Sequence, residues 1–239
     1  MGSFESASDE AQLAALAKPA VFKDDDFTGV TPLSFGGERT VYQATIRTTG
    51  EQVVIKEPTL GRRLATYIMT RREAVYAPYA HLDGDRIDLP ATVADERVKA
   101  LYNADQEDLF AMAQVAHIIC PHVAKPIGLK EGPDGYLGEA YSFYKGKMAQ
   151  DTGNPAESHP LTDEQWNFFQ GQVARLRSHG LRSWGDELQI NNVMRTGDGP
   201  EDIVFLEPPT QFDQNIATVD DGVTKELQKI WDRFEARKG

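Results

Sequence analysis

Hydrophobic and polar positions alternate in the first half of the chain in a way that predicts β-strands. β-Branched and aromatic residues alternate with polar ones over 40–46, and a second such strand is predicted over 52–56, after the turn at Thr49-Gly50. A glycine turn, Phe35-Gly36-Gly37-Glu38, precedes the first of these strands. From Val30 onward the pattern therefore predicts strand, glycine turn, strand, turn and strand.

Helices are predicted where apolar residues recur at helical spacing, and the clearest is 162–178. Thr162 is a suitable N-cap with Gln165 three residues later, and His179-Gly180 would end the helix. Other helices are predicted at 10–17, 62–77, 104–116 and 223–237, and other strands at 123–129, 136–143, 190–195 and 202–206.

This order of elements indicates an α+β protein with a β-rich front and a helix-rich back. Residues 1–28 are interpreted as a polar leader, and 29–143 as an antiparallel sheet with helices. A segment containing Lys, Gly, Asp and Pro near 144–155 marks the boundary with a short, mostly helical part over 144–239.

Composition narrows the class of protein. The chain has 239 residues, 40% of them hydrophobic, which suits one large domain or two small lobes. Its formal charge of −12 argues against general nucleic-acid binding, which depends on neutralising phosphates. The single cysteine, Cys120, rules out a disulfide framework, and no apolar run approaches the roughly 20 residues of a membrane helix.

The first residues carry one short targeting pattern. The N-terminus is acidic, unlike a secretory signal peptide, but Met1-Gly2-Ser3-Phe4-Glu5-Ser6 fits the pattern for myristoylation at Gly2. That pattern is common, and no basic cluster follows that would strengthen attachment through a single acyl chain.

Three segments could carry chemistry. Lys56 ends the apolar strand Val53-Val54-Ile55, where its ammonium group would be held for a phosphate. Asp186 and Asn191 lie five residues apart on one loop, and Glu207 ends an apolar strand before Pro208-Pro209. Taken singly, each has a plainer interpretation: a lysine at a strand end, a polar turn, and an exposed acid.

Together these segments resemble the protein-kinase-like superfamily over about residues 33–206. The family has a glycine-rich loop, a strand ending in a lysine, a catalytic aspartate with an asparagine five residues on, and a strand ending in Asp-Phe-Gly. Here Gly36 and Val41 match the loop, Lys56 the lysine, and Asp186 and Asn191 the catalytic loop. Glu207 stands where the Asp-Phe-Gly aspartate is expected.

The resemblance implies a two-lobed kinase-like fold that binds ATP and Mg²⁺ between an antiparallel N-lobe sheet and a short C-lobe. It implies that Lys56 holds the α- and β-phosphates and that Asp186 orients or deprotonates the acceptor hydroxyl. It further implies roles for other residues: Asn191 and Glu207 for Mg²⁺, Gly36 and Gly37 for phosphate approach, Val41, Val54 and Val193 around the adenine, and Phe143–Tyr144 as the hinge.

The chain also departs from the family pattern. Gly185 replaces the arginine before the catalytic aspartate, so activation by loop phosphorylation is not expected. Arg39 replaces the third glycine of the loop. Two glutamates compete as the partner of Lys56: Glu73 follows it closely in sequence, whereas Glu107 lies on the helix directly before the strand at 123–129.

The short C-lobe resembles that of minimal effector kinases from bacterial pathogens and some bacterial or phage kinases. It implies a monomeric Ser/Thr protein kinase that is cytoplasmic or injected into a host cell as a virulence effector, with a folded protein such as a chaperone as acceptor. A small-molecule kinase, an AMP transferase, a catalytically inactive pseudokinase and an unrelated α+β domain remain alternatives. Trp184, Glu207 and the incomplete glycine loop would be the marks of a pseudokinase.

Overall fold

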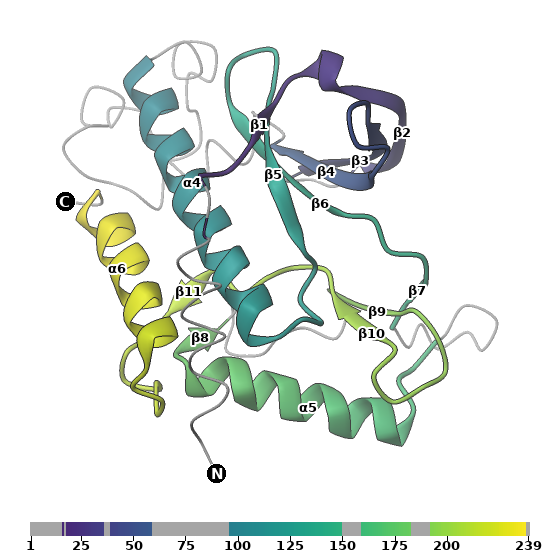
Figure 1. Ribbon diagram of the computed structural model, residues 1–239, viewed down its shortest axis with the longest axis vertical. Coiled ribbons are helices and arrows are strands. Elements are labelled where there is room, and N and C mark those ends of the chain that lie inside the picture. Colours follow the sequence, from purple (N-terminus) through teal and green to yellow (C-terminus); the bar gives the residue numbers. More distant parts are fainter. Residues whose placement is uncertain are drawn as a thin grey trace, which may run out of the picture. The chain divides into compact units, whose positions relative to one another are not determined.

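The computed structural model describes Leu16 and residues 18–35, 39–58, 96–149, 159–182 and 192–237 (Figure 1). Within these ranges the chain is α+β, with a six-stranded sheet formed mainly by the front half and three α-helices. The helix predicted at 62–77 lies outside the described residues, as does all but Leu16 of the helix predicted at 10–17.

The large sheet has the strand order β1-β5-β6-β4-β3-β2. Strands β2 to β4 form an antiparallel meander, and β4 is flanked by β3 and β6. The bounds are β1 Val21–Phe22, β2 Phe27–Phe35, β3 Arg39–Ile46, β4 Gln52–Pro58, β5 Pro126–Glu131 and β6 Leu137–Ser142. The predicted glycine turn falls between β2 and β3 in the sequence, and its residues 36–38 lie outside the described residues.

Two expectations about this sheet need correction. The sheet is mixed rather than antiparallel, because β1 pairs in parallel with β5, placing Val21 opposite Leu129. The polar leader is also shorter than predicted, since β1 belongs to the sheet and Phe27 is buried. A two-residue strand with a distant partner leaves no periodic signal in its own sequence, which explains why it was missed.

The helices follow apolar spacing, and one is much longer than predicted. Helix α4 covers Glu96–Ile119, α5 Asp163–Ser178 and α6 Gly222–Ala236. The predicted start of α5 is confirmed: the Thr162 hydroxyl accepts a hydrogen bond from the Gln165 backbone, and the Gln165 side chain accepts one from the Thr162 backbone. This capping box satisfies donors that a helix start leaves unpaired. No helix in the described ranges has both the length and the apolar character to cross a membrane.

The chain divides into two compact units, and the division is not a single cut. One unit comprises residues 1–18, 111–126 and 144–231, and the other 19–110, 127–143 and 232–239. The predicted boundary after Phe143 coincides with one of the points at which the chain passes from one unit to the other. The segments 111–126 and 232–239 belong to the units opposite to those that the predicted boundary implies.

The unit around the large sheet has its core on one side of the meander. Phe27, Ala44, Ile46, Val53 and Ile55 form a buried cluster there. A second cluster joins Phe110 of α4 to Leu129 and Leu137 of β5 and β6. The Asn103 amide of α4 donates to the Gly135 carbonyl at 2.8 Å and accepts from the Leu137 amide at 3.0 Å, which ties α4 to the β5–β6 turn.

The other unit is built around α5 and three short strand pairings. Strand β9 (Val193–Arg195) pairs with β10 (Ile203–Phe205) and β7 (Lys147–Met148), while β8 (Leu181–Arg182) pairs with β11 (Gln211–Phe212). A continuous buried cluster includes Phe169 and Leu176 of α5, Val193, Phe205 and Leu227. Phe205 stacks on Phe169 with ring centroids 5.4 Å apart, so the β9–β10 hairpin is anchored on α5.

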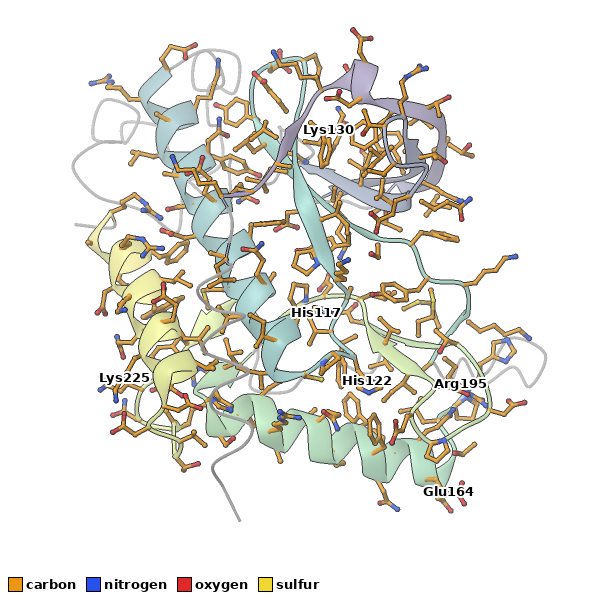
Figure 2. The ribbon with its side chains drawn as sticks, in the orientation of Figure 1. His117, His122, Lys130, Glu164, Arg195 and Lys225 are labelled. Atoms are coloured by element: carbon orange, nitrogen blue, oxygen red, sulfur yellow. The ribbon has the colours of Figure 1, made fainter. Side chains whose placement is uncertain are left out.

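A buried lysine links three segments of the large-sheet unit. The Lys130 side chain on β5 is 6% exposed, and its ammonium lies 2.7 Å from an Asp24 carboxylate oxygen (Figure 2). It also pairs with Glu57, the neighbour of Lys56 on β4. Burial lowers the pKa of Lys130, but hydrogen bonds to Asp24 and Glu57 outweigh it and raise that pKa above its usual value. The lysine therefore stays charged and holds together β5, the end of β4 and the segment that follows β1.

We predict that Lys130→Met lowers the free energy of unfolding by about 1.5–3 kcal/mol, because it removes the charge-assisted hydrogen bonds between a buried ammonium group and the carboxylates of Asp24 and Glu57. Urea denaturation followed by circular dichroism measures this loss. Lys229→Met is the matched control: Lys229 pairs with Glu226 on the surface of α6, and that exposed pair contributes only about 0.3–0.5 kcal/mol. Equal losses in the two variants would contradict the prediction.

Candidate functional site

The lysine predicted to bind phosphate lies on the central strand of the meander, on the face away from its core. Val53 and Ile55 are fully buried, so the alternation along β4 turns Val54 and Lys56 to the opposite face. Val41 of β3 lies directly opposite Lys56, and cross-strand neighbours share a face. The structure thus brings together three predicted cofactor residues: Val41, Val54 and Lys56.

Strand β6 adds two residues to this face that the sequence interpretation missed. Glu139 is the direct neighbour of Lys56, and Tyr141 is the neighbour of Val54. The Lys56 ammonium lies 5.2 Å from the centre of the Tyr141 ring, within cation–π range. Both Glu139 and Tyr141 are buried. Sequence reasoning missed both residues because β6 is almost entirely buried, so its positions show no alternation between apolar and polar residues.

Helix α4 packs on the same side of the sheet as Lys56. Leu137 precedes Glu139 by two residues on β6, so the two share a face, and Leu137 packs against Phe110 of α4. Of the two predicted partners of Lys56, Glu107 lies on this helix but is exposed, and no ion pair joins it to Lys56 among the described residues. Glu73 lies outside the described residues, as do Gly36 and Gly37.

The acidic residues that α4 does bury have another partner. Asp105 and Asp108 are buried and pair with two arginines at the end of α6. The Arg237 guanidinium lies 2.9 Å from Asp105 and also pairs with Asp108, and Arg233 lies 3.0 Å from Asp108. This cluster fixes the end of α6 on α4 in the large-sheet unit.

The residues predicted as a hinge follow directly after β6. The Phe143 amide donates to the Gln52 carbonyl at 3.0 Å and continues the pairing of β6 with β4. Tyr144 belongs to the other unit, where its hydroxyl accepts a hydrogen bond from the Lys125 amide at 3.1 Å. The chain therefore crosses from one unit to the other between Phe143 and Tyr144.

The β9–β10 hairpin carries the other half of the predicted site. Val193 is completely buried and lies opposite Phe205. Glu207 is exposed two residues beyond β10, and its carboxylate accepts a hydrogen bond from the Asn192 amide at 2.9 Å. Asp186 and Asn191 lie outside the described residues. Asn192 was not predicted, although its position directly after Asn191 could have drawn attention to it.

The strand that leads to Glu207 is held on both edges. Val123 forms a parallel bridge with Phe205, on the side of β10 away from β9. The Phe205 amide donates to the His122 carbonyl, and the Ala124 amide donates to the Phe205 carbonyl, both at 2.8 Å. The His122 ring also lies 3.2 Å from the Ile203 carbonyl (Figure 2). The strand that leads to Glu207 is thus paired along both edges.

Two titratable groups near this hairpin have pKa values that burial shifts. Cys120 is completely buried, and burial raises the pKa of its thiol. Burial also lowers the pKa of His117, and Lys125 and His122 lower it further, while a hydrogen bond to the Val123 carbonyl partly opposes them. The buried Cys120 thiol is therefore a poor nucleophile, because its thiolate form is disfavoured.

The donor set suits a magnesium ion that arrives with a nucleotide. The described residues contain no group of three or more His, Cys, Asp or Glu side chains able to hold a metal ion. Magnesium bound through one or two carboxylates and substrate phosphates needs no such group. Glu207 supplies an exposed carboxylate of this kind, so its chemistry fits the ion.

Comparison of the chain with models of known protein families gave no match, and neither did comparison with curated protein sequences.

Gly138 permits the close approach of β6 to Lys56. A Cβ atom at Gly138 would lie 2.7 Å from the Lys56 carbonyl oxygen and 3.2 Å from the Glu57 Cα. We predict that Gly138→Ala lowers the free energy of unfolding by about 1–3 kcal/mol, because backbone atoms on β4 must shift. Urea denaturation provides the measurement.

Gly171→Ala is the matched control for that substitution. Gly171 is exposed on α5, with nothing within 4 Å of an added Cβ atom. Alanine in a helix interior should therefore raise the free energy of unfolding by about 0.5–1 kcal/mol. If both variants changed the free energy of unfolding in the same direction, the pairing of β6 with β4 would not require glycine at position 138.

Proposed function

We propose that this protein is an ATP-dependent phosphotransferase of kinase-like fold that transfers the γ-phosphoryl group of ATP to a Ser or Thr hydroxyl of a protein. The observation that carries the proposal is the position of Lys56. It stands on the third strand of an antiparallel meander, shares a face with Val41 and Val54, and follows Gly36 and Gly37, which lie between the first two of these strands in the sequence. Protein kinases place their phosphate-binding lysine on the third strand, after a glycine-rich loop.

The other unit supplies a second, independent support. A strand ending in an acid follows the asparagine of the catalytic loop in kinases, and here β10 leads to Glu207 after Asn191 and Asn192. The Asn192–Glu207 hydrogen bond joins these two segments directly. In the sequence, Asp186 comes shortly before this hairpin.

Each residue has a defined part in the proposed reaction. The Lys56 ammonium would neutralise charge on the α- and β-phosphates, while Val41 and Val54 offer apolar contact for the adenine. Magnesium, held by Asn191 and Glu207, would supply charge neutralisation at the phosphates. Asp186 would accept the proton of the acceptor hydroxyl while the hydroxyl oxygen forms a bond to the γ-phosphorus. The bond from that phosphorus to the β–γ bridging oxygen breaks, and ADP leaves with the electron pair.

We propose a folded protein as the acceptor, as the resemblance to minimal effector kinases implies. In this proposal the protein binds no nucleic acid, in keeping with its charge of −12.

A labelling assay tests the proposal. The protein is incubated with Mg²⁺ and γ-labelled ATP in bacterial and eukaryotic lysates, next to Lys56→Met, Asp186→Asn and the surface control Lys229→Met. We expect a labelled acceptor band with the wild type and Lys229→Met, and a loss of label of at least 100-fold in the two site variants. The expectation for Asp186→Asn follows from the loss of the base and of its charge, each of which contributes substantially to catalysis.

Each contrary result has a distinct meaning. Label from α-labelled ATP instead of γ-labelled ATP would replace phosphoryl transfer by AMP transfer. Label on a small molecule alone would replace the protein acceptor. Equal labelling by wild type and Asp186→Asn, or no transfer with any acceptor, would overturn the proposed function.

A further inference from the structure

We propose that Asn192 is a positioning residue that holds Glu207 in the orientation needed to bind the nucleotide-bound magnesium ion. This inference rests on the proposed function and adds to it a residue outside the kinase-like motifs. Its starting observation is the hydrogen bond from the Asn192 side-chain nitrogen to one Glu207 carboxylate oxygen, at 2.9 Å.

The backbone brings these two side chains together. Val193 and Phe205 are paired across the hairpin, and one step further the Leu206 amide donates to the Asn192 carbonyl at 2.7 Å. Asn192 therefore reaches Glu207 as a continuation of the β9–β10 pairing.

Proline restricts the backbone of Glu207. A residue before proline is disfavoured in helical conformation, and here Glu207 precedes Pro208, which is buried with Pro209. The backbone is thus confined while the glutamate side chain still has three rotatable bonds. An exposed side chain with that freedom would sample many orientations. The Asn192 bond removes much of this freedom and leaves the second carboxylate oxygen for a cation.

The length of the side chain matters in this arrangement. The kinase-like motif has aspartate at the end of this strand, and aspartate is one methylene shorter than Glu207. From the same backbone position, an aspartate carboxylate would fall short of the Asn192 amide. Hydrogen-bonded partners behind a metal-binding carboxylate commonly change metal affinity by about 10–100-fold when removed. We infer that Asn192 and the longer glutamate act as a unit.

Binding of Mn²⁺, which replaces Mg²⁺ and is visible by electron paramagnetic resonance, tests this inference. Mn²⁺ is titrated into the full chain in the presence of saturating non-hydrolysable ATP analogue. We expect Asn192→Ala to weaken Mn²⁺ binding about 10-fold, and Glu207→Asp to weaken it to a similar extent. The double variant Asn192→Ala/Glu207→Asp should bind Mn²⁺ no more weakly than either single variant. Glu207→Gln, which removes the charge, should lose the most affinity.

A matched control exists in the same unit. The Asn215 side-chain nitrogen donates to an Asp213 carboxylate oxygen at 3.1 Å, also on the surface. Asn215→Ala removes the same kind of bond and should leave Mn²⁺ affinity unchanged. In transfer assays Asn192→Ala should raise the Mg²⁺ concentration needed for half-maximal rate, with kcat recovering at high Mg²⁺. If Asn192 only stabilised the fold, high Mg²⁺ would not restore kcat.

The outcomes separate the inference from the proposed function. If wild type binds Mn²⁺ with the ATP analogue and Glu207→Gln weakens it, but Asn192→Ala or Glu207→Asp matches wild type, the positioning role is wrong and the proposed function stands. If wild type binds neither the analogue nor Mn²⁺, both are overturned.

Discussion

The alternation of side chains along β4 is the constraint on which the large-sheet unit depends. With β3 on one edge and β6 on the other, β4 must direct every second side chain to each face of the sheet. Val53 and Ile55 fill the core, and Lys56 is therefore obliged to stand on the other face. A shift of the register by one residue would bury the lysine and expose the core, so folding and the position of the ammonium group are coupled.

Contacts with neighbouring residues also fix the positions of β4 and β10. Gly138 lets β6 lie close against Lys56, and Tyr141 places its ring within range of the ammonium. Lys130 binds Glu57, the next residue on β4, and ties it to Asp24. In the other unit, β10 is held between β9 and the segment at Val123. Each half of the proposed site thus rests on a strand that is paired along both edges.

Periodic segments were predicted well, and short or distant pairings were not. Strands β3 and β4 and the capping box of α5 follow from local patterns that the structure confirms. Strands β1, β7, β8 and β11 have two residues each, too few to show a period. Helix α4 begins at Glu96, whereas its start was predicted at 104. The first turns were missed because they bury only isolated residues such as Val98 and Tyr102.

The candidate site could be predicted only where residue identity and strand position coincide. Lys56, Val41 and Val54 were predicted from the strand pattern, and the structure places them on one face. Glu139 and Asn192 escaped prediction because their importance comes from a partner far away in the sequence: Lys56 for one and Glu207 for the other. Glu107 shows the converse, since its place on α4 suggested a partner for Lys56 but its side chain is exposed.

The most direct test of the central claim is to find which lysine lies at the phosphates of bound ATP. An acyl-phosphate derivative of ATP transfers its acyl group to a nearby lysine, and mass spectrometry identifies the modified residue. The account predicts acylation of Lys56 that excess ATP with Mg²⁺ suppresses. Acylation of another lysine in an ATP-sensitive manner, or acylation of Lys56 that ATP does not suppress, would contradict it.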